Sequence, residues 1–104
     1  MILTFISCSS KGDFAGVYRN SKNPSIVLTL LENGTYQYQE RGKVYNSGNW
    51  DYKDNGWLQI SFYKWKDIPS FNLRDCKNSC LAVVTYDNGE LVFQPDDDSF
   101  NFKK

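Results

Sequence analysis

The sequence predicts an all-β domain folded as a single antiparallel up-and-down meander of about eight strands. Residues that favour strands alternate with polar ones almost throughout the chain after residue 14. No window of roughly 11 residues or more carries apolar positions at helical spacing. Three dipeptides that favour tight hairpins each separate two apolar runs: Asn33-Gly34, Asn55-Gly56 and Asn88-Gly89. Because closure removes exposed strand edges, we expect a small barrel or half-barrel, with a β-sandwich as the alternative.

The alternation also places each strand along the chain. We expect strands at about 15–19, 25–31, 34–40, 43–50, 57–64, 80–86, 90–94 and 98–103. In the second strand, Ile26, Leu28 and Leu30 share one face, because successive side chains of a strand point to opposite sides. In the third strand the tyrosines Tyr36 and Tyr38 face inward and the glutamines face outward.

The later strands supply the rest of the predicted core. The inward set continues with Leu58, Ile60, Phe62, Val83, Leu91, Phe93, Phe100 and Phe102. The register of the sixth strand is open, because residues 81–84 are apolar on both faces. Residues 66–79 show no clear period and form the one long connection, which Pro69 restrains.

Composition excludes several classes of function. The chain has 104 residues, with 12 Lys+Arg against 12 Asp+Glu and no histidine. This length suits one domain, and the balanced charge argues against a nucleic-acid partner. Lack of histidine excludes Ser-His-Asp and Cys-His catalysis. Inward pairs of carboxylates, a P-loop and a dinucleotide fingerprint are also missing from the sequence, so we predict no enzyme, no catalytic residue and no cofactor.

The N-terminus reads as the end of a secretory signal. Residues 1–7 are mostly apolar, and a polar stretch follows Cys8. The run Phe5-Ile6-Ser7-Cys8 resembles the lipobox of a bacterial envelope lipoprotein. We therefore expect residues 1–7 to be a remnant of a signal peptide, 8–13 a polar tether and 14–104 the all-β domain. The alternative is that residues 2–6 form a buried first strand.

The lipoprotein resemblance implies a place in the cell. It implies cleavage before Cys8, acylation of that cysteine and attachment to a membrane, so the protein would be periplasmic or anchored to the outer membrane of a bacterial cell envelope. Several acyl chains, each methylene contributing about 0.8 kcal/mol, make such an anchor effectively permanent.

The other two cysteines form a candidate disulfide. If Cys8 is acylated, Cys76 and Cys80 remain as a pair separated by three residues. In an oxidising compartment they would close a small loop, which contributes about 2 kcal/mol. A redox-active dithiol is the rival, although its usual spacing is Cys-x-x-Cys. A zinc site would need two further thiolate or imidazole ligands, so no metal site is predicted.

A second resemblance concerns the β domain itself. The segments Gly16-Val17-Tyr18, 30–36 and Gly48-Asn49-Trp50 resemble small lipocalin-like domains of the calycin type found in envelope lipoproteins. That resemblance implies a β-barrel and, as an alternative function, a carrier of a small apolar ligand.

Two surface features of the sequence are considered as binding sites, an aromatic face and an acidic run. Counting in steps of two from Trp57 places Trp57, Tyr63 and Trp65 on one face of the fifth strand, where they could stack against a glycan or an apolar protein partner. The alternative is that this face belongs to the core. The acidic run 96–98 lacks the spacing of a calcium loop and reads as a solvated turn.

Together these features predict a cell-envelope lipoprotein that displays a small, non-catalytic β-barrel domain for binding or structural support. A non-lipidated interaction or inhibitor module is the other alternative.

Overall fold

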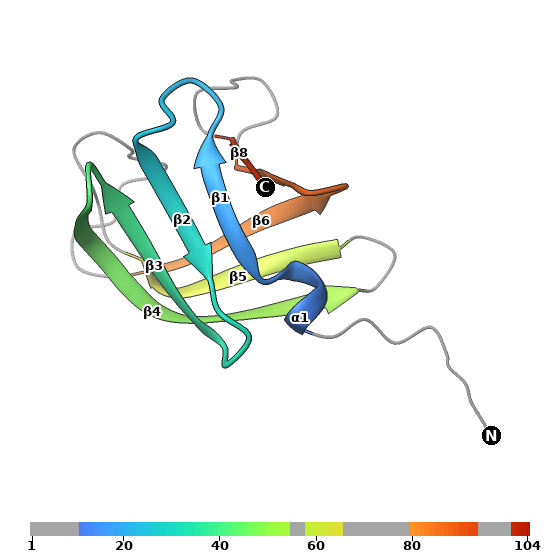
Figure 1. Cartoon of the computed structure of the whole chain (residues 1–104). Helices are drawn as coiled ribbons and strands as arrows, with labels where there is room; N and C mark the ends of the chain where they lie inside the picture. The colour runs from blue at the N-terminus through green and yellow to red at the C-terminus, as the bar shows by residue number, and fades with distance from the viewer. Residues whose placement is uncertain (1–10, 55–57, 66–79, 94–100) are drawn as a thin grey trace.

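The computed structural model describes residues 11–54, 58–65, 80–93 and 101–104. Its strands form a closed antiparallel barrel in which each strand pairs with the next along the chain and β8 pairs with β1 (Figure 1). The elements are α1 (Lys11–Phe14), β1 (Gly16–Asn20), β2 (Ile26–Leu30), β3 (Thr35–Glu40), β4 (Lys43–Asp54), β5 (Leu58–Trp65), β6 (Cys80–Asp87), β7 (Glu90–Val92) and β8 (Phe102–Lys103). The predicted up-and-down meander is confirmed and closes into a barrel, an architecture compatible with a lipocalin-like domain.

One element was not expected from the sequence. Residues Lys11–Phe14 form a single helical turn beside the end of the barrel where β1 begins (Figure 1). A four-residue helix is too short to produce a helical period, and its first three residues fall in the range expected to be a polar tether. Phe14 is buried because its ring packs against Tyr52 and Tyr86, with centroids 4.9 and 5.0 Å away.

Two of the hairpin turns have two successive residues with positive φ, and only one of them contains an Asn-Gly dipeptide. Asn88 and Gly89 both have positive φ, 50° and 87°, as a two-residue turn requires. Arg41 and Gly42 do the same between β3 and β4, with φ of 53° and 83°. The turn at Asn88 and Gly89 was predicted from its dipeptide. The turn at Arg41 and Gly42 lies in the two-residue gap between the expected strands 34–40 and 43–50, although arginine is uncommon at that position. The dipeptide 55–56 lies outside the described residues.

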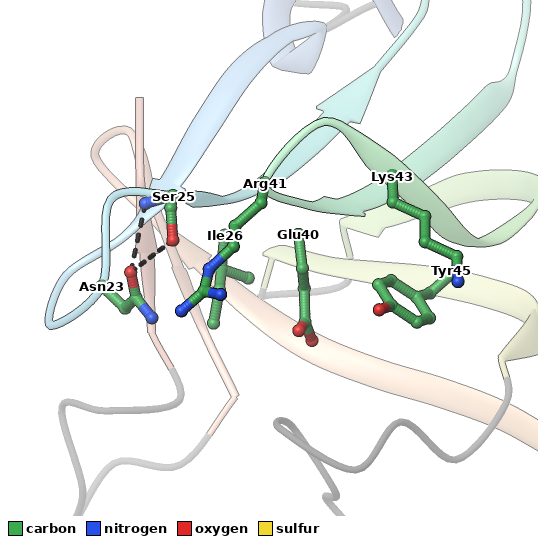
Figure 2. Close-up of a pocket in the computed structure, with 7 residues that line it drawn as sticks. All are labelled: Asn23, Ser25, Ile26, Glu40, Arg41, Lys43 and Tyr45. Carbon is green, nitrogen blue, oxygen red and sulfur yellow. Dashed lines mark hydrogen bonds between the residues drawn. The ribbon is translucent and has the colours of Figure 1, made fainter.

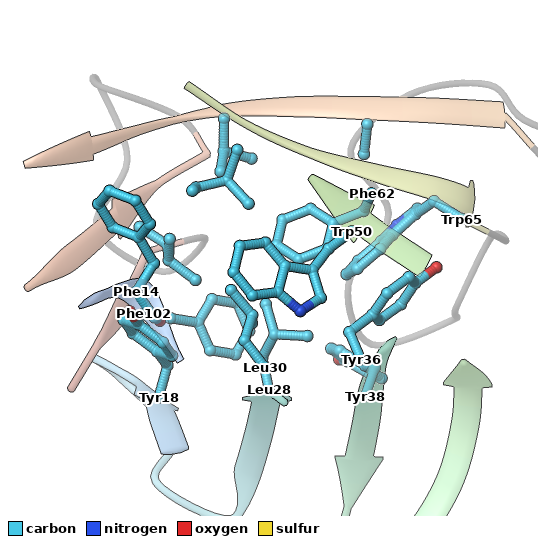
Figure 3. Close-up of a cluster of buried hydrophobic side chains, with 14 of the residues drawn as sticks. Phe14, Tyr18, Leu28, Leu30, Tyr36, Tyr38, Trp50, Phe62, Trp65 and Phe102 are labelled. Carbon is cyan, nitrogen blue, oxygen red and sulfur yellow. Dashed lines mark hydrogen bonds between the residues drawn. The ribbon is translucent and has the colours of Figure 1, made fainter. Parts of the chain in front are cut away.

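The core is rich in large aromatic side chains (Figure 3). The buried hydrophobic residues are Phe14, Tyr18, Ile26, Leu28, Leu30, Tyr36, Tyr38, Trp50, Ile60, Phe62, Trp65, Ala82, Val84, Leu91 and Phe102. Phe93 is half-buried against them. The prediction for Val83 was wrong: it is 43% exposed, and Ala82 and Val84 point inward instead. Alternation cannot choose between the two faces where both are apolar. Phe100 lies outside the described residues.

Gly48 allows β4 to pass close to the core. A Cβ atom at Gly48 would lie 2.6 Å from the Tyr63 carbonyl oxygen and 3.1 Å from the Tyr36 ring. The Tyr36 hydroxyl donates a hydrogen bond of 2.8 Å to the same carbonyl. We expect Gly48→Ala to lower the free energy of unfolding by about 1–3 kcal/mol, because backbone and ring must move apart. Urea denaturation measures the loss. Ser47→Ala, at the exposed neighbouring position, is the control, and equal stability of both variants would contradict this packing.

Candidate functional site

A polar cavity of about 360 Å³ opens at the end of the barrel where β1 leads into β2 and β3 turns into β4 (Figure 2). We call it the rim pocket. Its lining residues are Asn23, Ser25, Ile26, Glu40, Arg41, Lys43 and Tyr45. The pairing of Ile26 with Glu40 across β2 and β3 brings the two parts of its wall together.

The first wall is the connection between β1 and β2, which side-chain hydrogen bonds hold in place. The buried Asn20 accepts hydrogen bonds at Oδ1 from the backbone N–H groups of Lys22 and Asn23, at 3.0 and 2.8 Å. Its amide nitrogen donates to the carbonyl oxygen of Asn101, at 3.3 Å. Asn23 Oδ1 in turn accepts from the backbone N–H and the hydroxyl of Ser25, at 3.2 and 2.6 Å. This wall is therefore ordered before any ligand arrives.

The second wall is the hairpin between β3 and β4. The Arg41 backbone N–H donates to the Ser25 carbonyl oxygen at 3.0 Å, which ties the hairpin to the first wall. The side chain of Arg41 points from the turn into the pocket (Figure 2). Lys43 places its Nζ atom 5.0 Å from the centroid of the Tyr45 ring, within the range of a cation–π contact. The hairpin thus places two positive charges in the wall of the pocket, one on either side of Glu40 (Figure 2).

The carboxylate of Glu40 is positioned by a hydrogen bond from the buried Tyr38. The Tyr38 hydroxyl donates a hydrogen bond of 2.9 Å to Glu40 Oε2. Burial of Tyr38 raises its pKa far above the usual value, and the bond to Glu40 and the charges of Glu40 and Tyr45 raise it further. Tyr38 therefore stays protonated at neutral pH and acts only as a donor, which fixes the position of the Glu40 carboxylate.

The charges of the pocket are arranged to receive a ligand. Among the described residues, neither Arg41 nor Lys43 forms an ion pair with a carboxylate, whereas Lys11 and Asp51 approach to 3.9 Å on another part of the barrel. The guanidinium and ammonium groups can bind an anion, and Glu40 can accept hydrogen bonds from hydroxyl or ammonium groups. The part of the chain that the structure describes contains no cluster of His, Cys, Asp or Glu that could hold a metal ion.

The predicted aromatic face does not form as expected. Trp65 is only 2% exposed and lies in the core, whereas Tyr63 is 44% exposed on the outside. The reason is a register shift in β5 between Phe62 and Trp65, where Lys64 has a φ of 60°. This irregularity breaks the two-residue period and turns Trp65 inward. Trp65 therefore belongs to the core, as the alternative interpretation of this face expected. Trp57 lies outside the described residues.

The other predicted residues remain predictions. Cys8, Cys76 and residues 96–98 lie outside the described residues. Cys80 begins β6, where its backbone pairs with that of Trp65. None of the helices in the described part of the chain has the length and apolarity needed to cross a membrane.

Sequence patterns do not predict the rim pocket. Its strongest local signal is the run of Glu40, Arg41 and Lys43 around Gly42, which places three charges at a tight turn. A charged hairpin tip is common on protein surfaces, so this signal alone does not indicate a site. What makes the pocket is the connection 21–25, which the pairing of β2 with β3 brings against the hairpin.

In the described part of the barrel, large aromatic side chains pack against one another in the interior. The ring of Trp65 stacks on Tyr36 with centroids 5.8 Å apart, and Phe93 stacks on Phe62 at 5.9 Å. Trp50 lies among these rings and donates from its indole nitrogen to the Leu31 carbonyl oxygen at 2.9 Å (Figure 3). A ligand therefore finds polar, accessible groups at the rim and not among these side chains.

Comparisons of the chain with protein-family models, with curated proteins and with solved structures each found no match.

Proposed function

We propose that this protein is a cell-envelope lipoprotein, anchored through Cys8, whose barrel is a non-catalytic binding domain. The observation that carries the binding role is the rim pocket, where an ordered wall and a charged hairpin enclose about 360 Å³. A pre-formed polar pocket favours binding because little conformational freedom is lost when a ligand enters. A carrier of small apolar ligands needs an enclosed apolar cavity, and the described interior residues instead pack as a cluster of aromatic side chains.

The position of α1 supports the anchor. Only Ser9 and Ser10 separate Cys8 from Lys11, so the Cα atoms of Cys8 and Lys11 lie at most about 11 Å apart. The helix lies beside the start of β1, and the rim pocket lies at the end of the barrel where β1 finishes (Figure 1). A lipid on Cys8 would therefore hold the barrel close to a membrane with the rim pocket facing away from it.

The chemistry of the pocket supports binding without catalysis. Glu40 is the only carboxylate among the described residues that line it, so those residues supply no pair of carboxylates for acid–base chemistry. Tyr38 keeps its proton at neutral pH and cannot act as a general base. Arg41 and Lys43 supply fixed positive charge, which suits recognition of an anion.

Metabolic labelling with a fatty acid tests the anchor. The chain, expressed in bacteria behind a complete lipoprotein leader, is expected to take up label, and Cys8→Ala is expected to lose it entirely. Cys76→Ala is the matched control and should keep the label, because only the lipobox cysteine is acylated. An unlabelled wild type, or label that persists in Cys8→Ala, would overturn the lipoprotein assignment.

A protein-interaction module is the second candidate. On the outside of β5 and β6, Tyr63, Leu81 and Val83 are 44%, 45% and 43% exposed. The pairing of β5 with β6 places these three side chains close together on one face. An exposed apolar group of this kind suits a protein partner. Absence of lipid on the wild type in the labelling experiment would favour this interaction module over the lipoprotein.

A further inference from the structure

We infer that the rim pocket binds an acidic saccharide, a sugar ring that carries a carboxylate group. This inference rests on the proposed binding role of the pocket and names its class of ligand. It depends on four properties of the pocket: its positively charged groups, its hydrogen-bond donors and acceptors, the carboxylate of Glu40 and its size.

Arg41 is the group that would hold the carboxylate. Its guanidinium presents donors in a planar fork that matches the two oxygens of a carboxylate. The positive φ of 53° at Arg41 is unfavourable for a residue other than glycine, asparagine or aspartate. The hairpin accepts this conformation and, as a result, directs the guanidinium into the pocket (Figure 2). Lys43 adds a second positive charge to the pocket on the far side of Glu40, beside Tyr45 (Figure 2).

Glu40 and Asn23 would recognise the hydroxyl groups of the sugar. Glu40 lines the pocket with a carboxylate that Tyr38 holds in place, and a carboxylate accepts hydrogen bonds from hydroxyl groups. Asn23 uses its Oδ1 atom to bind Ser25. Its Nδ2 group donates to no other described residue, and it is available to a ligand oxygen. The pocket thus offers both acceptors and donors beside the anion site, as a polyhydroxylated ligand requires.

The same carboxylate selects against more highly charged anions. A phosphate dianion next to Arg41 would also lie in the pocket that Glu40 lines, and the repulsion between them would offset part of the attraction. A sugar acid carries a single negative charge and can direct its hydroxyl groups toward Glu40. Its smaller charge and its hydroxyl groups therefore fit this set of residues better than phosphate does.

The volume of the pocket limits the ligand to a small unit. About 360 Å³ lies near the lower end of the range of roughly 300–1,000 Å³ that is usual for small-molecule sites. One sugar ring with its carboxylate fits this range, and further units of a glycan would extend into solvent. Because the proposed anchor is at the opposite end of the barrel, a glycan chain could reach the pocket without meeting the membrane.

Titration followed by ¹⁵N–¹H NMR tests the ligand class. The full chain carrying Cys8→Ala is titrated with D-galacturonate, with D-galactose, which lacks the carboxylate, and with inorganic phosphate. Galacturonate is expected to shift the amide signals of residues 23–26 and 40–45 in a saturable way. Its affinity should exceed those of galactose and phosphate by at least about ten-fold. Higher salt should weaken galacturonate binding, because the attraction is between charges.

A substitution at the turn separates binding from folding. Arg41→Asn removes the guanidinium but suits the positive φ of the turn, so the variant is expected to be as stable as the wild type or slightly more stable. Its affinity for galacturonate should fall by at least about ten-fold. Arg19→Gln, an exposed cation outside the pocket, is the matched control and should bind as the wild type does.

The outcomes distinguish this inference from the proposed function. Equal binding of galactose and galacturonate, stronger binding of phosphate, or an unchanged affinity in Arg41→Asn would overturn the acidic-saccharide assignment and leave the lipid anchor untouched. Absence of any shift in residues 23–26 and 40–45 with all three compounds would overturn it as well. The fatty-acid labelling of Cys8 is independent of these titrations, so either result can fail alone.

Discussion

Replacing Trp65 with alanine is expected to lower the free energy of unfolding by about 3–5 kcal/mol. The indole is 2% exposed, and its ring centroid lies 5.4 Å from that of Phe62 and 5.7 Å from that of Tyr38. Truncation would remove these aromatic contacts and leave a cavity that the surrounding rigid rings cannot fill. Such a loss is a large part of the stability of a small domain, which is about 5–15 kcal/mol.

Tyr63→Ala is the matched control for this prediction. Tyr63 lies two residues earlier on β5, but its side chain is 44% exposed on the outside of the barrel. Its substitution should change the free energy of unfolding by less than about 1 kcal/mol. Chemical denaturation of both variants, followed by circular dichroism, measures the difference. Similar small losses in the two variants would mean that Trp65 is not part of the core and that the register shift in β5 is wrong.

The contrast between Trp65 and Tyr63 shows where alternation along a strand no longer predicts which face a side chain occupies. A period of two correctly places Ile60 and Phe62 inside the barrel. The same count then places Trp65 outside, because a period cannot detect an irregularity whose cause is the local backbone at Lys64. The strands and the barrel follow from repeated alternation and turn residues, and a single bulge changes neither. The face of one residue beyond the bulge does depend on it.

The rim pocket was harder to predict for a different reason. Its two walls, residues 20–26 and 40–45, are separated along the chain and meet because β2 pairs with β3 in a register that sets Ile26 opposite Glu40. The Asn33-Gly34 turn indicates that these strands form a hairpin, but not which side chains at its far end enclose a cavity. That depends on the hydrogen bonds of Asn20 and Asn23, which alternation does not reveal.

High pH is expected to unfold the barrel through its buried tyrosines. Tyr18, Tyr36 and Tyr38 are fully buried, and burial raises the pKa of each far above the ordinary value of 10.0. Interactions with Tyr86 raise the pKa of Tyr18 further, and Glu40 does the same for Tyr38. Their hydroxyl groups are donors in the folded protein: Tyr18 donates to the Phe14 carbonyl oxygen, and Tyr36 to that of Tyr63.

The direction of the pH effect follows from these shifts. In the unfolded chain the three tyrosines lose their protons near pH 10, whereas the folded barrel keeps them protonated to higher pH. The folded state therefore binds more protons above about pH 10, and its stability falls as the pH rises. Each tyrosine contributes a loss of up to about 1.4 kcal/mol per pH unit, so all three together approach about 4 kcal/mol per unit. Well below pH 10 these three tyrosines are protonated in both states, so they contribute no pH dependence to the free energy of unfolding.

Two spectroscopic signals measured on the same sample test this prediction. The ionisation of Tyr18, Tyr36 and Tyr38, followed by phenolate absorbance, should coincide with the loss of the β-sheet signal in circular dichroism. Tyr36→Phe removes one ionisable group that burial alone perturbs, so the fall in stability above pH 10 should become less steep by about 1.4 kcal/mol per unit. Ionisation of Tyr18, Tyr36 and Tyr38 near pH 10 with the sheet intact would show that these hydroxyl groups are open to solvent and would contradict their burial in the core.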